Sequence, residues 1–141
     1  MKKKVPKILV VGSERAFSDL YGVLEATRAY QLEYAAYWGT ANVFLEPPPA
    51  LVLLDISLAN FTFGGQAVDG LVLSRLIKDD PATAHIPVLL ATAHAMEGDR
   101  ERFLAASKAD DYLQKPIFDP AVLVEKVKGL LDTSGKRDLR G

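Results

Sequence analysis

Cysteine is absent from this chain of 141 residues, and the only histidines are His85 and His94. These two shortages exclude disulfide scaffolds, thiolate zinc sites, cysteine nucleophiles and histidine-rich metal sites. Long apolar runs are also missing, because the run after the basic start, residues 8–11, is too short for a signal peptide or a membrane span. We therefore expect a cytoplasmic protein that makes no contact with a membrane.

The chain also lacks an excess of either charge, since 17 Lys and Arg residues face 18 Asp and Glu residues and leave a formal charge of -1. This balance excludes a polybasic arm, so we expect no direct binding of nucleic acid. With 49% hydrophobic and 25% charged residues, the composition is that of a globular domain. We predict one domain over residues 1–132 and a polar tail over residues 133–141, too short to be an output domain.

Short apolar runs alternate with amphipathic stretches along the chain. The runs predict strands at residues 7–11, 32–37, 51–54, 86–91 and 111–113. Apolar residues at helical spacing predict helices at residues 14–28, near 73–79, at 97–106 and from Asp119 onward, with a short helical piece at 43–45 and a loop at 57–66. Strands that are mostly apolar suit a parallel sheet covered on both faces, and right-handed crossovers make it doubly wound. The predicted fold class is therefore α/β.

Polar residues gather where the predicted strands end, at the edge of a doubly wound sheet that holds the functional crevice. Asp55 follows the third strand, Thr92 the fourth and Lys115 the fifth. A carboxylate, a hydroxyl and an ammonium group together suit the acceptance of a phosphoryl group. Asp55 would be the nucleophile that forms an acyl phosphate, while Lys115 and Thr92 would bind its oxygens.

At residues 5–132 the chain resembles the receiver domain of two-component response regulators. The segments that carry the resemblance are KILVV at 7–11, LLDI at 53–56, DGL at 69–71, DPATAHIPV at 80–88, ATAH at 91–94 and ADDYLQKP at 109–116. Their order and spacing together are highly specific. The resemblance implies a flavodoxin-like sheet of five parallel strands in the order 2-1-3-4-5, with helices on both faces.

The same resemblance implies a stand-alone signalling module, not an enzyme. A sensor histidine kinase or phosphotransfer protein would phosphorylate Asp55 with Mg²⁺, and Thr92 and Tyr112 would relay the change. A downstream protein partner would then read the face formed by the last two helices and the fifth strand. The bond before Pro116 resembles one that the family holds in the cis form, which would direct Lys115 into the site. Homodimerisation is left open.

The first departure from the family comes directly after the first strand. Receivers carry an adjacent acidic pair there, whereas this chain has Gly12 and Ser13, with Glu14 one place later. Since Mg²⁺ usually takes one or two carboxylates among its oxygen ligands, Asp55 and Glu14 are the candidates for a weak metal site. The alternative, which we favour for Glu14, is that Ser13 caps the first helix and Glu14 stabilises its positive end.

The second departure is the loop after Asp55. Receivers usually read D-x-x-M-P there and reach D-G within a few residues, whereas this chain lacks the proline and reaches Asp69-Gly70 late. The insertion at residues 60–68 is interpreted as a lid, a partner contact or a tolerated surface loop, and we slightly favour the last.

Two other functions stay open. The missing acidic pair also suits a pseudo-receiver, a protein-binding module of the same fold that works without phosphorylation. A flavodoxin-like mononucleotide-binding protein is the third hypothesis. Gly12 is the only glycine near the end of the first strand, and this lack of a glycine-rich phosphate loop argues against nucleotide binding.

Overall fold

The computed structural model describes residues 5–12, 14–35, 49–56, 62–63, 66–67, 69–92, 98–114 and 119–140. For residues 14–19, 34–35, 62–63, 66–67 and 134–140 it describes the backbone alone. The short helical piece predicted at residues 43–45 lies outside these ranges.

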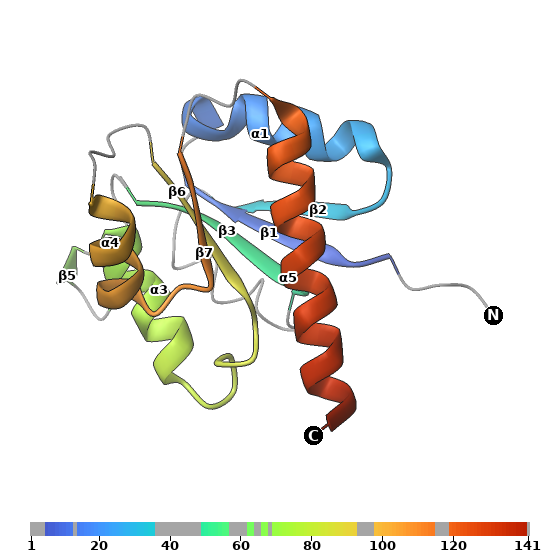
Figure 1. The fold of residues 1–141 in the computed structure, drawn as a ribbon. Coiled ribbons are helices and arrows are strands. Elements are labelled where there is room, and N and C mark those ends of the chain that lie inside the picture. Colours follow the sequence, from blue (N-terminus) through green and yellow to red (C-terminus); the bar gives the residue numbers. More distant parts are fainter. Residues whose placement is uncertain are drawn as a thin grey trace.

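Five parallel strands form the central sheet in the order β2-β1-β3-β6-β7 (Figure 1). The strands are β1 (Lys7–Val11), β2 (Gln31–Ala35), β3 (Leu51–Asp55), β6 (Val88–Thr92) and β7 (Asp111–Gln114). All residues of β3 and β6 are buried, as expected for central strands covered on both faces. The predicted fold class and strand order are confirmed.

In the described part of the chain four helices cover the sheet, α1 and α5 on one face and α3 and α4 on the other (Figure 1). Leu20 and Leu24 of α1 (Glu14–Thr27) and Leu123 and Val127 of α5 (Pro120–Arg140) pack on one face. On the other face the packing residues come from α3 (Gly70–Asp79) and α4 (Asp99–Ser107), and they are Leu73, Ile77, Phe103 and Leu104. Consecutive side chains of a strand alternate between these two apolar layers. No helix in the described ranges has an apolar stretch that would span a bilayer.

The strand predicted at 86–91 is described at Val88–Thr92, and the bounds of α3 and α4 are shifted by up to three residues from those predicted. The described elements differ from the predicted ones at three further places. Two short antiparallel strands, β4 (Thr62–Phe63) and β5 (Gln66–Ala67), lie where we predicted a loop. The strand predicted at 32–37 is described at Gln31–Ala35, because its N-terminal residue already pairs with Lys7 of β1. Helix α5 continues to Arg140, so the backbone expected to be a polar tail is helical. The domain boundary at residue 132 stays a prediction.

Candidate functional site at the carboxyl edge of the sheet

Asp55 is the last residue of β3, and its side chain is almost completely enclosed. The residue is 4% exposed, at the end of a strand whose other residues are fully buried. Asp55 pairs with Ala91 of β6, and the next amide, of Ile56, donates a 3.0 Å hydrogen bond to the Ala91 carbonyl. Aspartate is rarely buried to this degree without a structural or functional partner. The strand therefore delivers a fixed carboxylate to the edge where a crevice is expected.

Thr92 ends the neighbouring strand, β6, and is 2% exposed. Its strand pairs with β3 on one side and with β7 on the other, where Thr92 lies opposite Gln114. Because adjacent parallel strands end at the same edge of a sheet, Asp55 and Thr92 both lie at the carboxyl edge, on neighbouring strands. Their placement on adjacent strands is the one we predicted.

Gly70 holds the start of α3 against the end of β3. Its amide donates a 2.9 Å hydrogen bond to the carbonyl of Ile56. A Cβ at this position would lie 2.6 Å from the Ile56 Cα and 2.8 Å from the Asp55 carbonyl carbon, and closer still to the Asp55 carbonyl oxygen. Only glycine allows this approach. Gly70 therefore sets the backbone position of Asp55, a role that sequence reasoning missed although Asp69-Gly70 was noted as a motif.

Asp69 begins α3 as its N-cap. Its Oδ1 accepts a 2.9 Å hydrogen bond from the amide of Val72, which would otherwise lack a partner at the helix start. One oxygen of the Asp69 carboxylate is thus engaged in capping the helix. The cap and the glycine together place the first turn of α3 beside the site.

Gly12 follows β1 at the same edge, with a backbone φ of 154°. This positive φ favours glycine, so any side chain here, including the carboxylate of the family's acidic pair, would be strained. Within the described ranges, no group of three or more acidic or histidine side chains is placed to hold a metal. Of the acidic residues considered for Mg²⁺, Asp55 is the one whose side chain is described, because Glu14 is described by its backbone alone.

Tyr112 lies in β7 with its ring turned inward, and the residue is 6% exposed. Its ring centroid is 6.2 Å from that of Phe103 in α4, with an interplanar angle of 37°. The buried hydroxyl makes no hydrogen bond within the described part of the chain. Burial, and to a lesser extent the carboxylate of Asp99, raise the pKa of the Tyr112 phenol above its ordinary value. Tyr112 thus joins β7 to α4 through an apolar contact.

One carboxylate links the three elements of the predicted output face. Asp111 in β7 lies 3.6 Å from Arg100 of α4 and 3.3 Å from Lys126 of α5, measured between charged atoms. All three side chains are partly exposed, so each pair contributes little to stability. The two pairs connect α4, β7 and α5 through the single carboxylate of Asp111.

Several predicted residues lie outside the described parts of the chain. These are Ser13, Lys115, Pro116 and His94, together with the side chain of Glu14 and most of the insertion at 60–68. Their roles stay predictions. The structure therefore brings together Asp55 and Thr92 at one edge, with Tyr112 two residues before the end of the adjoining strand.

Residues 8–128 match the response regulator receiver domain family, and the chain belongs to this family. Over 126 residues it is 37% identical to the phosphate regulon transcriptional regulatory protein PhoB of Klebsiella pneumoniae, covering 89% of this chain and 51% of that protein. The DNA-binding dual master transcriptional regulator RpaA of Synechocystis is 33% identical over 128 residues, which cover 90% of this chain and 49% of RpaA. The chain thus spans about half the length of these curated relatives.

Solved structures that are similar to this chain are also receiver domains. The signal receiver domain of a signal transduction histidine kinase from Syntrophus aciditrophicus superposes with a TM-score of 0.72 at 32% identity, over 91% of each chain. A CheY-like response regulator receiver domain from Methanospirillum hungatei gives a TM-score of 0.74 at 26% identity, over 95% of this chain and 99% of that one. The protein is therefore a response regulator receiver domain of the kind used in two-component signalling.

Proposed function

We propose that this receiver domain accepts a phosphoryl group on Asp55. The observation that carries the proposal is the enclosed carboxylate at the end of β3, beside the enclosed hydroxyl of Thr92 at the end of β6. Burying a carboxylate is costly unless it is paired or hydrogen-bonded, so the enclosure of Asp55 supports a specific role for this side chain. The family match over residues 8–128 supports the same chemistry.

In the proposed reaction an oxygen of the Asp55 carboxylate forms a bond to phosphorus. The bond from phosphorus to the donor breaks, and the donor keeps its electron pair. The Thr92 hydroxyl would donate a hydrogen bond to one phosphoryl oxygen, and the ammonium group of Lys115 would neutralise another. A sensor histidine kinase or a phosphotransfer protein is the proposed donor.

Mg²⁺ would bind this site weakly. Receiver domains generally use the ion at the phosphorylation site, and with one or two carboxylates it completes its octahedron from water and phosphate oxygens. Asp55 supplies one carboxylate, Gly12 supplies none, and Glu14 is the candidate for the second. When bound, Mg²⁺ would offset the negative charge between the carboxylate and the phosphoryl oxygens.

We propose that the output surface is the face formed by α4, β7 and α5. Phosphorylation at the carboxyl edge would act on Thr92 and then on Tyr112, whose ring contacts Phe103 of α4. A downstream protein would dock on the polar surface around Asp111. Stand-alone action of residues 1–132 and homodimerisation stay predictions.

The proposal is tested by incubating the protein with a small acyl-phosphate donor, with and without Mg²⁺, and measuring intact mass. We expect one added phosphoryl group in the parent protein and none in Asp55→Asn, which keeps the shape of the side chain. Asp69→Asn is the matched control, because that carboxylate caps α3 at the same edge, and labelling should persist. No labelling of the parent, under conditions that label an ordinary receiver, would refute phosphoryl acceptance.

The alternative function is a pseudo-receiver that binds a partner without phosphorylation. The backbone of Gly12 favours this alternative, since a carboxylate side chain at its φ of 154° would be strained. Partner binding that is equal for the parent and for Asp55→Asn, with or without an acyl-phosphate donor, would support it. A large difference between these two proteins would support the phosphorylated switch.

A further inference from the structure

The most enclosed ion pair in the described ranges lies at the opposite edge of the sheet from Asp55. The Nζ atom of Lys78 is 2.8 Å from Oδ2 of Asp110, and the two side chains are 11% and 16% exposed. In every other ion pair of these ranges, at least one side chain is 28% exposed or more. Lys78 belongs to the last turn of α3, and Asp110 directly precedes β7.

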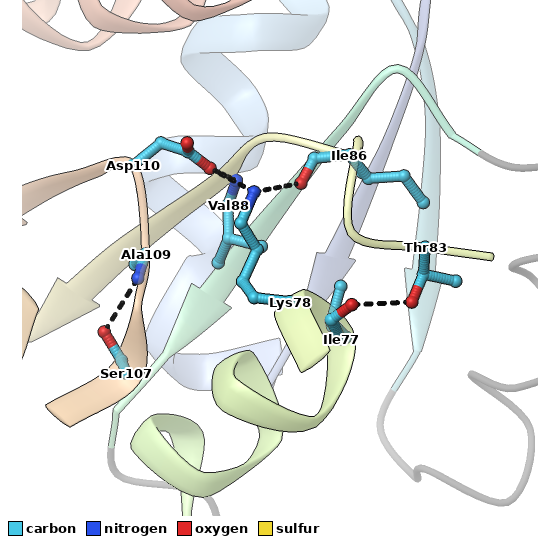
Figure 2. Close-up of polar contacts among 8 residues, drawn as sticks. All are labelled: Ile77, Lys78, Thr83, Ile86, Val88, Ser107, Ala109 and Asp110. Atoms are coloured by element: carbon cyan, nitrogen blue, oxygen red, sulfur yellow. Dashed lines mark hydrogen bonds and ion pairs between the residues drawn. The ribbon is translucent and has the colours of Figure 1, made fainter. Parts of the chain in front are cut away.

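Asp110 acts as an extra rung between β6 and β7 (Figure 2). Its amide donates to the Val88 carbonyl at 2.9 Å, and its Oδ2 accepts from the Val88 amide at 2.8 Å. In a parallel ladder, the amide of a residue normally pairs with a strand carbonyl. Here the chain has just left α4, with Lys108 in the left-handed conformation at a φ of 58°. The carboxylate of Asp110 therefore takes the place of the carbonyl that a longer β7 would supply.

Lys78 completes this junction with two hydrogen bonds from one ammonium group. Besides the carboxylate of Asp110, it donates to the carbonyl of Ile86 at 3.0 Å (Figure 2). A carboxylate enclosed to this degree is costly without a partner of opposite charge. One side chain thus ties the end of α3 to the start of β6 and the start of β7. We call Lys78 and Asp110, with the Ile86 carbonyl and the Val88 backbone, the amino-edge clamp.

The amino-edge clamp lies at the first residues of the pairing between β6 and β7, where it can fix the register of β7. The strand has four residues and lies at the edge of the sheet, so β6 is its single neighbouring strand. Its register runs from Leu89 opposite Asp111 to Thr92 opposite Gln114. A slip of one residue would turn Tyr112 to the other face of the sheet. A short edge strand has few rungs to prevent such a slip, and Asp110 supplies the first of them.

We propose that Lys78 and Asp110 are positioning residues for the phosphorylation site. They fix β7 on β6, and so determine where Tyr112 packs and where Gln114, the residue before Lys115, ends the strand. Since a strand rises roughly 3.3 Å per residue, the four steps from Asp110 to Gln114, the last residue of β7, span about 13 Å. The effect of the clamp on phosphorylation rests on the proposed function, whereas its effect on the register of β7 against β6 does not.

Hydrogen exchange of the full chain tests the register. Asp110→Asn removes the charge but keeps an acceptor, Asp110→Ala removes both, and Lys78→Met removes the cation. We expect the amides of β7 to exchange about tenfold faster or more in Asp110→Ala and Lys78→Met, with much smaller changes in β1. Lys78→Arg should restore protection, because a guanidinium can bond both acceptors.

Asp79→Asn is the matched control. It removes the pairing of Asp79 with Lys108 at the same junction, where the side chains are 46% and 52% exposed, and should leave β7 protected. Equal acceleration in β1 and β7, or the same change in this control, would overturn the register role. If Asp110→Ala does not fold, the milder Asp110→Asn and Lys78→Met decide the question.

Labelling by an acyl-phosphate donor tests the effect on the site. At temperatures where circular dichroism shows each variant folded, Asp110→Ala should be labelled about tenfold more slowly than Asp79→Asn, because small displacements of binding groups are costly. Equal rates, despite faster exchange in β7, would overturn the positioning role. A parent protein that takes no label would refute the proposed function instead, and the exchange result would still decide the register.

Discussion

Replacing Gly70 by alanine should disrupt the junction that positions Asp55. The added Cβ would meet backbone atoms of Asp55 and Ile56, with 2.6 Å to the Ile56 Cα. Backbone atoms cannot rotate away as a flexible side chain can, so α3 would have to move outward and weaken the 2.9 Å bond between Gly70 and Ile56. Overpacking of this kind costs about 1–3 kcal/mol and occasionally more. We expect a loss of roughly 3 kcal/mol in the free energy of unfolding.

Gly129→Ala provides the same chemical change without the contact. Gly129 lies in α5, and a Cβ there would have no neighbour within 4 Å. Alanine favours the helix, so this variant should gain about 0.4–1 kcal/mol. Two glycine-to-alanine substitutions should thus change stability in opposite directions.

Urea denaturation followed by far-ultraviolet circular dichroism measures both effects. With an m-value of roughly 1–3 kcal/mol per molar, the Gly70→Ala midpoint should fall by about 1–3 M, whereas the Gly129→Ala midpoint should rise slightly. A Gly70→Ala protein within about 0.5 kcal/mol of the parent would refute the close approach of α3 to β3.

Two further predictions concern the face of the sheet that α3 and α4 cover. Tyr112→Phe should leave the free energy of unfolding unchanged or raise it by up to about 1 kcal/mol, because the lost hydroxyl is buried and makes no hydrogen bond in the described ranges. The raised pKa of Tyr112 means that the unfolded chain loses the phenolic proton first, so stability falls as pH rises above 10.0, the ordinary pKa of the phenol. In alkaline urea titrations, Tyr112→Phe should therefore lose less stability above this pH than the parent protein. Part of the remaining loss comes from Tyr30, because burial also raises the pKa of that phenol. Destabilisation of Tyr112→Phe near neutral pH would contradict this interpretation. Leu90→Ala should cost about 2–5 kcal/mol because Leu90 is fully buried, whereas exposed Val72→Ala should stay within about 0.5 kcal/mol, and similar urea midpoints would contradict the core assignment.

The sheet and its edge residues were predictable because their signals are local. Wholly apolar runs such as Leu51–Leu54 can only be central strands, and a polar residue directly after such a run must lie at the carboxyl edge. Asp55 and Thr92 were found in this way. The role of Tyr112, by contrast, was predicted from the resemblance to receivers and not from a periodic pattern, because both Tyr112 and Leu113 of this short strand are buried.

Other features depend on contacts between distant segments. The close approach of Gly70 to Asp55 needs the crossing of α3 over β3, and the pairing of Lys78 with Asp110 joins residues 32 positions apart. A periodic sequence pattern does not encode which distant segments come into contact. The strands β4 and β5 were missed because two-residue strands carry no detectable alternation. The length of α5 was missed because polar residues after Leu131 were interpreted as a tail.

The absent acidic pair has a structural counterpart in Gly12. The φ of 154° at this residue favours glycine over a residue with a side chain, such as aspartate. The missing carboxylate thus goes together with a backbone conformation that favours glycine, and an aspartate at position 12 would strain the turn after β1. Phosphorylation, if it depends on Mg²⁺, must depend on fewer protein carboxylates than in other receivers.

The most direct test of the central claim is the mass of the intact protein after exposure to an acyl-phosphate donor. We predict one phosphoryl group per chain, faster labelling as Mg²⁺ is raised to high concentration, and no label on Asp55→Asn. An unlabelled parent beside a labelled ordinary receiver, or an Asp55→Asn protein that is labelled as well as the parent, would contradict the claim that Asp55 is the phosphoryl acceptor.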